Sequence, residues 1–138
     1  PTLATIWRIT KALESPLEDI LSVKEGTTCF EKLSQNATPE VMSEDSGFRL
    51  KILGTLNTVS TVQWYEFTAE PKAELVSEAH GTGSLESLTL CKGELTVIVG
   101  DETQYICKGD TLRFRPDVAH RLKNEGKEKT HGFMVNLL

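Results

Sequence analysis

Short apolar runs separated by tight turns fill the chain from Phe48 to its end. The runs that we expect to form strands are 48–53, 62–68, 73–76, 85–91, 95–99, 103–107, 111–115, 120–123 and 131–137. The turns between them carry Gly, Asp, Pro or Asn, as in Gly100-Asp101 and Asn124-Glu125-Gly126. Many short strands at this spacing predict an antiparallel barrel or sandwich and not an α/β fold.

Alternation within the runs predicts which side chains face the interior, because neighbouring residues of a strand point to opposite faces. One face of the later runs carries Leu112, Phe114, His120 and Leu122, and the other carries Arg113, Arg115, Arg121 and Lys123. Glu86 shares a face with Leu88 and Leu90. We therefore expect Glu86 and His120 to point inward, where ionisable groups are costly unless they are paired, hydrogen-bonded or bound to metal.

Residues 1–22 have helical and not strand-like spacing. Thr2 can cap a helix whose apolar positions include Ile6 and Leu13, and Ser15 with Glu18 forms a capping-box pattern that starts a second helix. Helices this short need tertiary partners to be stable in water. Residues 23–47 are mostly polar and predict a linker, within which the turn Asp45-Ser46-Gly47 joins the run 40–42 to Phe48 as a first hairpin.

Composition excludes several classes of protein. A length of 138 residues suits one main domain with an appendage, and no apolar run approaches the ~20 residues that span a bilayer. The net charge of −5 argues against an extended phosphate-binding surface in these residues. The cysteines, an odd number without metal-type spacing, are expected to be small buried or half-buried side chains in a reducing cytoplasm.

Two half-matched motifs give a resemblance to the cupin superfamily of small β-barrels. The first motif, G-x5-H-x-H-x3,4-E-x6-G, is met by His80, Glu86 and Gly93, while Thr82 stands at its second histidine and Glu74 at its leading glycine. The second motif, G-x5-P-x-G-x2-H-x3-N, is met by Gly109, His120 and Asn124. Its proline comes one place late as Pro116, and Asp117 replaces its inner glycine. The resemblance implies a mainly β, double-stranded β-helix (jelly-roll) barrel over residues 48–138.

The same resemblance implies a pocket at the barrel mouth formed by His80, Thr82, Glu86, Phe114 and His120. Two imidazoles and a carboxylate can hold non-haem Fe(II), or Zn(II) with a water, so a divalent metal (Zn, Fe, Mn or Ni) on His80, Glu86 and His120 is one prediction. The alternative is a pocket that needs no metal, in which Glu86 and His120 hydrogen-bond each other and a polar ligand.

The opening residues resemble the last two helices of an Xre-type helix-turn-helix domain. The resemblance rests on the sequence of residues 1–13, PTLATIWRITKAL, and on that of residues 16–21, PLEDIL. It implies that 1–22 end a DNA-binding domain whose groove-reading helices lie ahead of Pro1. An ordinary helical hairpin packed on the barrel is the alternative.

Together these patterns predict a cytoplasmic transcriptional regulator that is not an enzyme. In this interpretation the barrel of residues 48–138 senses a small-molecule effector and forms a homodimer, and the helix-turn-helix head binds DNA. No membrane partner is expected. The alternative is a metal-dependent cupin enzyme, an oxygenase or isomerase, that uses His80, Glu86 and His120.

Overall fold

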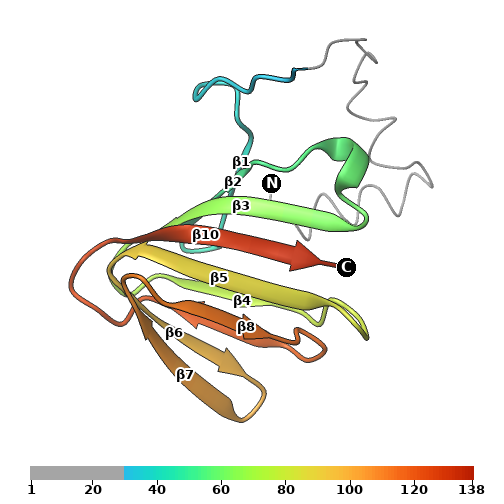
Figure 1. Ribbon diagram of the computed structural model, residues 1–138. Coiled ribbons are helices and arrows are strands. Elements are labelled where there is room, and N and C mark those ends of the chain that lie inside the picture. The colour runs from blue at the N-terminus through green and yellow to red at the C-terminus, as the bar shows by residue number, and fades with distance from the viewer. Residues whose placement is uncertain (1–29) are drawn as a thin grey trace.

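The computed structural model describes residues 30–138, which fold into two facing antiparallel sheets (Figure 1). The predicted helices and the domain boundary at residue 22 lie outside the described residues. Within 30–138, helix is limited to the single 3-10 turn η1 (Leu56–Thr58), and no helix is long or apolar enough to cross a membrane.

The strands match the predicted runs to within one or two residues at each end. Their bounds are β1 (Glu40–Met42), β2 (Phe48–Ile52), β3 (Val62–Ala69), β4 (Glu74–Ser77), β5 (Leu85–Lys92), β6 (Glu94–Val99), β7 (Glu102–Cys107), β8 (Thr111–Phe114), β9 (His120–Lys123) and β10 (Thr130–Leu137). One sheet has the order β1-β2-β3-β10-β5-β8 and the other β4-β9-β6-β7. This is the jelly-roll arrangement that the motifs imply, made of two sheets and not of one continuous closed sheet.

The first hairpin forms as predicted, because a polar turn fixes the chain between β1 and β2. Val41 pairs with Leu50, and both are buried. The Asp45 carboxylate accepts hydrogen bonds from the Ser43 hydroxyl and from the Gly47 amide. These two hydrogen bonds hold the pKa of Asp45 below its ordinary value.

Alternation places the core between the sheets. Phe48 and Phe67 stack with ring centroids 5.5 Å apart, and Leu88, Leu90 and Leu122 are almost fully buried. The predicted outward face is confirmed for Arg113, Arg115 and Arg121, which are exposed, while Lys123 is half-buried. The prediction for the cysteines is wrong where it can be checked: Cys91 and Cys107 are unpaired and exposed, because both lie at outward positions near strand ends.

Candidate functional site

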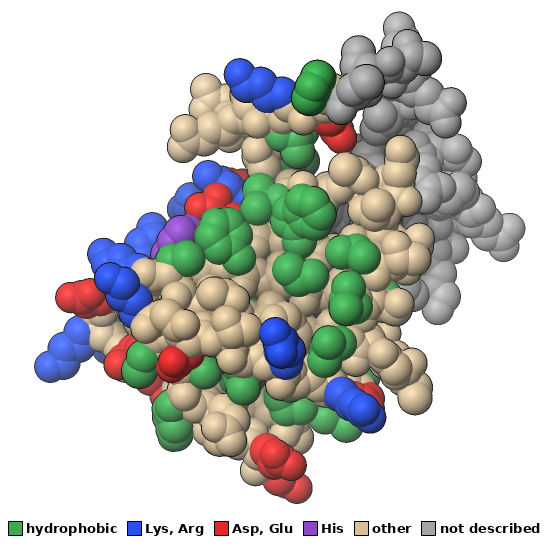
Figure 2. All heavy atoms as spheres, in the orientation of Figure 1, with side chains coloured by type: hydrophobic (Ala, Val, Ile, Leu, Met, Phe, Trp, Pro, Cys, Tyr) green, Lys and Arg blue, Asp and Glu red, His purple; other side chains and the backbone are tan. Residues whose placement is uncertain are grey.

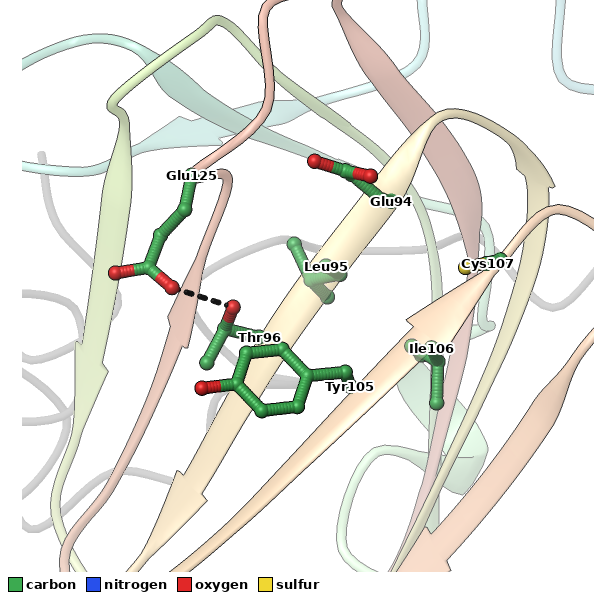
Figure 3. Close-up of a pocket in the computed structure, with 7 residues that line it drawn as sticks. All are labelled: Glu94, Leu95, Thr96, Tyr105, Ile106, Cys107 and Glu125. Atoms are coloured by element: carbon green, nitrogen blue, oxygen red, sulfur yellow. Dashed lines mark hydrogen bonds between the residues drawn. The ribbon is translucent and has the colours of Figure 1, made fainter.

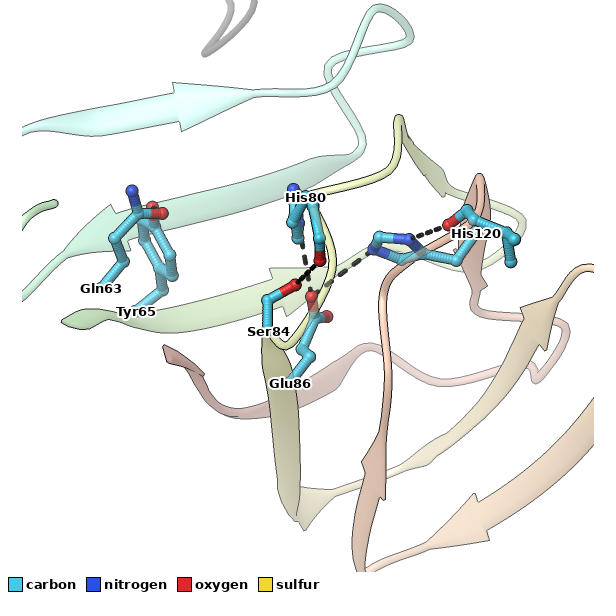
Figure 4. Close-up of polar contacts among 8 residues, drawn as sticks. Gln63, Tyr65, His80, Ser84, Glu86 and His120 are labelled. Atoms are coloured by element: carbon cyan, nitrogen blue, oxygen red, sulfur yellow. Dashed lines mark hydrogen bonds and ion pairs between the residues drawn. The ribbon is translucent and has the colours of Figure 1, made fainter. Parts of the chain in front are cut away.

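Glu86 and His120 come from opposite sheets and meet inside the barrel, where they are only 1% and 2% exposed. Glu86 is the second residue of β5, and His120 is the first residue of β9. His80 lies in the loop between β4 and β5, and its amide donates a hydrogen bond to the carbonyl of Pro116 (2.8 Å). Two loops and two strands thus bring together the three residues that the cupin motifs predict (Figure 4).

The two imidazoles converge on one carboxylate oxygen. Glu86 Oε2 lies 3.6 Å from His80 Nε2 and 3.5 Å from His120 Nε2. The rings of the two histidines meet edge to face with centroids 5.1 Å apart. These separations are long for hydrogen bonds, so the contacts are mainly electrostatic.

Electrostatics couples the members of this cluster. Burial alone raises the pKa of Glu86, but the contacts with His120 and His80 outweigh burial and leave the pKa below its ordinary value. Burial lowers the pKa of His120, whereas the carboxylate of Glu86 and the carbonyl of Val118 raise it, and the net pKa lies above the ordinary value. Burial and the charge of Glu86 raise the pKa of Tyr65 to about 12.

The orientation of the His120 ring suits a metal ligand. Its Nδ1 lies 3.1 Å from the carbonyl oxygen of Val118, and because a carbonyl can only accept, Nδ1 must donate. Nε2 is then left facing the cluster, as in histidine ligands whose other nitrogen is held by a backbone carbonyl. His120 Nε2 and Glu86 Oε1 are both buried without a hydrogen-bond partner within the described part of the chain.

The three residues therefore fit a divalent metal. One ligand atom from each of His80, Glu86 and His120 lies within 4.8 Å of the others. Two imidazole nitrogens and one carboxylate oxygen are a donor set used for Fe(II) and for Zn(II), with further positions left for water or a ligand.

The other predicted pocket residues have different places. The ring of Phe114 lies edge to face with His120, with centroids 5.4 Å apart. Thr82 is exposed on the loop that follows His80, between Gly81 and Gly83. Asn124, the last residue of the second motif, is buried and serves the fold: its amide donates to the carbonyls of Ala69 (2.9 Å) and Glu128 (2.8 Å).

Sequence reasoning missed a polar row that continues from Glu86 across the six-stranded sheet. Asn136 on β10 pairs in register with both Gln63 and Glu86, so their side chains share the inner face. Asn136 is 3% exposed, and its Oδ1 has no hydrogen-bond partner among residues 30–138. Tyr65 donates a hydrogen bond to Gln63 Oε1 (2.9 Å) beside this row (Figure 4). The available signal was an asparagine at an inward position of the last strand, two residues after Met134.

Two hollows differ in their relation to the cluster. The smaller, of about 130 Å³, lies over β6 and β7, where the hydroxyl of Thr96 donates to Glu125 Oε2 (2.7 Å, Figure 3). The larger, of about 550 Å³, lies between β6, β7 and β8, and Phe114 is part of its wall. Phe114 and Val118 in the wall of the larger hollow contact His120, which is not itself part of the lining.

Comparison with known proteins agrees with this architecture. The sequence model described as "Cupin domain" matches residues 65–136. The HTH-type transcriptional regulator SutR of Escherichia coli (strain K12) is 28% identical over 134 residues, which are 95% of this chain and 68% of SutR.

Solved structures share the fold at low sequence identity. An HTH_3 family transcriptional regulator from Vibrio cholerae superimposes with a TM-score of 0.68 and 19% identity, covering 100% of this chain and 72% of that one. The structure of FeII HppE gives a TM-score of 0.68 and 14% identity, covering 99% of this chain and 76% of that one. These likenesses show a common fold that occurs in proteins with different activities.

Proposed function

This chain belongs to the cupin domain family, and we propose that it is the effector-sensing part of a cytoplasmic transcriptional regulator with a helix-turn-helix head. The observation that carries the proposal is the extent of the similarity to SutR. The similarity covers 134 residues and thus extends well beyond the matched cupin region 65–136. It reaches into the opening residues that resemble the end of an Xre-type domain.

The mechanism that we propose is linkage between the barrel and DNA. A small molecule bound near His80, Glu86 and His120 stabilises one arrangement of a dimer relative to another, which changes how two DNA-binding heads are spaced. Coupling of a typical ~1–3 kcal/mol would change DNA affinity ~5–150-fold. Glu86 Oε1 and His120 Nε2 are buried without a hydrogen-bond partner in the part of the chain that the structure describes, which supports a ligand at this place.

The dimer that this mechanism needs is proposed to form through the outer face of the six-stranded sheet. Trp64, Phe133 and Leu137 are each more than 40% exposed there, on the paired strands β3 and β10. Figure 2 shows hydrophobic side chains gathered on this face. Contiguous apolar surface of this kind is typical of protein–protein contacts, and here the partner is a second copy. Light scattering at micromolar concentration should give twice the mass of the chain, and Trp64→Glu should give the monomer.

DNA selection tests the proposal as a whole. The protein is expressed from its full gene, with any residues that are encoded ahead of Pro1. It is then used to select sequences from a random library of double-stranded DNA. We expect enrichment of one inverted-repeat sequence, and three further helices encoded upstream of Pro1. A protein that enriches no sequence, or an upstream region that encodes another kind of domain, would overturn the regulator assignment.

A metal-dependent cupin enzyme is the second candidate, and the cluster of His80, Glu86 and His120 is the observation that favours it. A divalent metal held there would supply Lewis-acid activation of an oxygen atom of water or substrate. His80 and His120 would hold the metal through Nε2, Glu86 would add a negative charge, and the surrounding burial would exclude bulk water. Stoichiometric metal in the purified protein, with turnover lost in both Glu86→Ala and His120→Ala, would favour the enzyme. A purified protein that cannot retain added Fe(II) would dismiss it.

A further inference from the structure

The cavity of about 550 Å³ opens between the end strands of the two sheets, β7 and β8. Its size lies within the ~300–1,000 Å³ typical of small-molecule pockets. Half of its lining residues are aliphatic or aromatic and come from both sheets and from the loop between β8 and β9: Val97, Val99, Leu112, Phe114 and Val118. The cavity can therefore enclose an apolar group of a few carbon atoms or more.

Part of the wall of this cavity lies next to His120. Phe114 packs edge to face against the imidazole, and Val99 is the in-register neighbour of His120 on β6. The carbonyl of Val118 accepts the hydrogen bond from His120 Nδ1. Three cavity residues thus contact or flank His120, although His80, Glu86 and His120 do not themselves line the cavity.

The charged residues around the cavity do not favour a charged ligand. Arg113 and Arg115 are balanced by Glu102 and Asp117, and all four are exposed. Selection for a polar group of the ligand must then come from the buried residues next to Phe114.

Next to this wall lie two buried polar atoms without a hydrogen-bond partner among residues 30–138, Glu86 Oε1 and His120 Nε2. While the Glu86 carboxyl group is ionised, its Oε1 accepts hydrogen bonds and cannot donate one. A hydroxyl group has one proton to donate and an oxygen that accepts, so it can donate to Glu86 Oε1 and, where His120 Nε2 carries a proton, accept from that nitrogen. A carboxylate lacks the donor, and a hydrocarbon lacks both functions.

We propose that this cavity binds the apolar part of a small alcohol whose hydroxyl group pairs with Glu86 and His120. The identification of this alcohol as an effector rests on the proposed function, whereas the binding site itself does not. The ring of Phe114 stands at the junction of the cavity and the polar pair, and it must turn aside for the hydroxyl to reach both atoms.

A series of straight-chain alcohols tests the site directly. Binding of 1-propanol through 1-octanol to the metal-free 138-residue chain is followed by methyl chemical shifts in NMR spectra. We expect affinity to rise about fourfold for each added CH₂ until the cavity is full and then to level off, since each buried methylene contributes ~0.8 kcal/mol. The matched carboxylates, propanoate through octanoate, are expected to bind at least about tenfold more weakly. Equal binding of alcohols and carboxylates, or no dependence on chain length, would overturn the proposal.

Two neighbouring residues of β6 provide a matched pair of variants. Val99 lines the cavity, whereas Ile98 pairs with Arg121 on the outer face, and both side chains are half-buried. Val99→Phe should fill the cavity and abolish the gain in affinity beyond the shortest alcohols, while Ile98→Phe should bind like the wild type. If Val99→Phe fails to fold, as judged by circular dichroism, Leu112→Phe takes its place. A filled cavity that still binds 1-hexanol with wild-type affinity contradicts the proposal.

Different experimental results would disprove the alcohol site and the regulator assignment. Alcohols that bind as predicted without altering DNA affinity would leave the cavity site in place and remove its sensing role. Sequence-specific DNA binding by a protein that binds no alcohol in this cavity would retain the regulator and overturn the alcohol site.

Discussion

Glu86 Oε2 and His120 Nε2 lie 3.5 Å apart between the two sheets, with less than 3% of either side chain exposed. Ionisable groups so deeply buried lose hydration that mutual attraction only partly replaces. We therefore attribute the pair to function and not to stability. His80 places a second imidazole beside the same carboxylate oxygen.

Removing the negative charge of Glu86 should weaken metal binding without unfolding the barrel. Glu86→Gln keeps the shape of the side chain but loses its charge, so we expect Co(II) affinity, measured by absorption titration, to fall at least ~10–100-fold. His131→Gln is the matched control, because His131 pairs with Glu66 on the outer face at 2.8 Å. Equal loss in both variants, or no Co(II) binding by the wild type, would contradict the metal fit.

Asn124 should be a stability residue. Its side chain donates to two carbonyls and accepts from the amide of Gly126 (3.0 Å), and all of these tie the chain around β9 together. Asn124→Ala leaves buried groups without partners, which should lower the free energy of unfolding by roughly 2–4 kcal/mol in urea denaturation. The exposed Asn57→Ala should cost almost nothing. A loss of less than about 0.5 kcal/mol would show that water replaces these hydrogen bonds.

Substitution by alanine should lower stability by different amounts at two glycines of the cupin motifs. Both have positive φ, 80° at Gly93 and 93° at Gly109, and strain at such a residue costs ~1–2 kcal/mol. A Cβ at Gly93 would also lie 2.7 Å from Thr130 Oγ1 and 3.0 Å from Thr130 Cα, whereas no atom of residues 30–138 lies within 4 Å of one at Gly109. Thermal denaturation should therefore show a clearly larger loss for Gly93→Ala than for Gly109→Ala. The reverse order would mean that the Gly93 turn adjusts freely.

Tyr65 should govern stability at high pH. Its pKa is raised to about 12 in the fold, while an unfolded chain ionises near ~10, so the unfolded state loses its proton first. Stability linked to this proton is complete below pH ~10 and is lost as pH rises towards 12. In Tyr105→Phe, which leaves Tyr65 as the only tyrosine, absorbance of the phenolate should appear with a midpoint near 12. A midpoint near 10 in the folded protein would show that the phenol is open to water.

The strands and the inward face could be predicted because period-two alternation is a local property of the sequence. Glu86, His120 and Phe114 were placed by it, and the motifs brought His80 to the same site. The resemblance predicted a pocket at the barrel mouth, but the walls of the cavity could not be predicted, because they depend on how far β7 and β8 stand apart in two sheets. The role of Asn136 was missed since an isolated polar residue in a strand says nothing of its neighbours on β3 and β5.

Binding of the selected DNA sequence by the complete protein, with and without saturating 1-hexanol, tests the central claim most directly. Fluorescence anisotropy at fixed salt should show a change of ~5–150-fold in affinity for the wild type and no change for Val99→Phe, while Ile98→Phe behaves like the wild type. DNA affinity that is unchanged when the cavity is filled, in a protein that demonstrably binds the alcohol, would contradict the account.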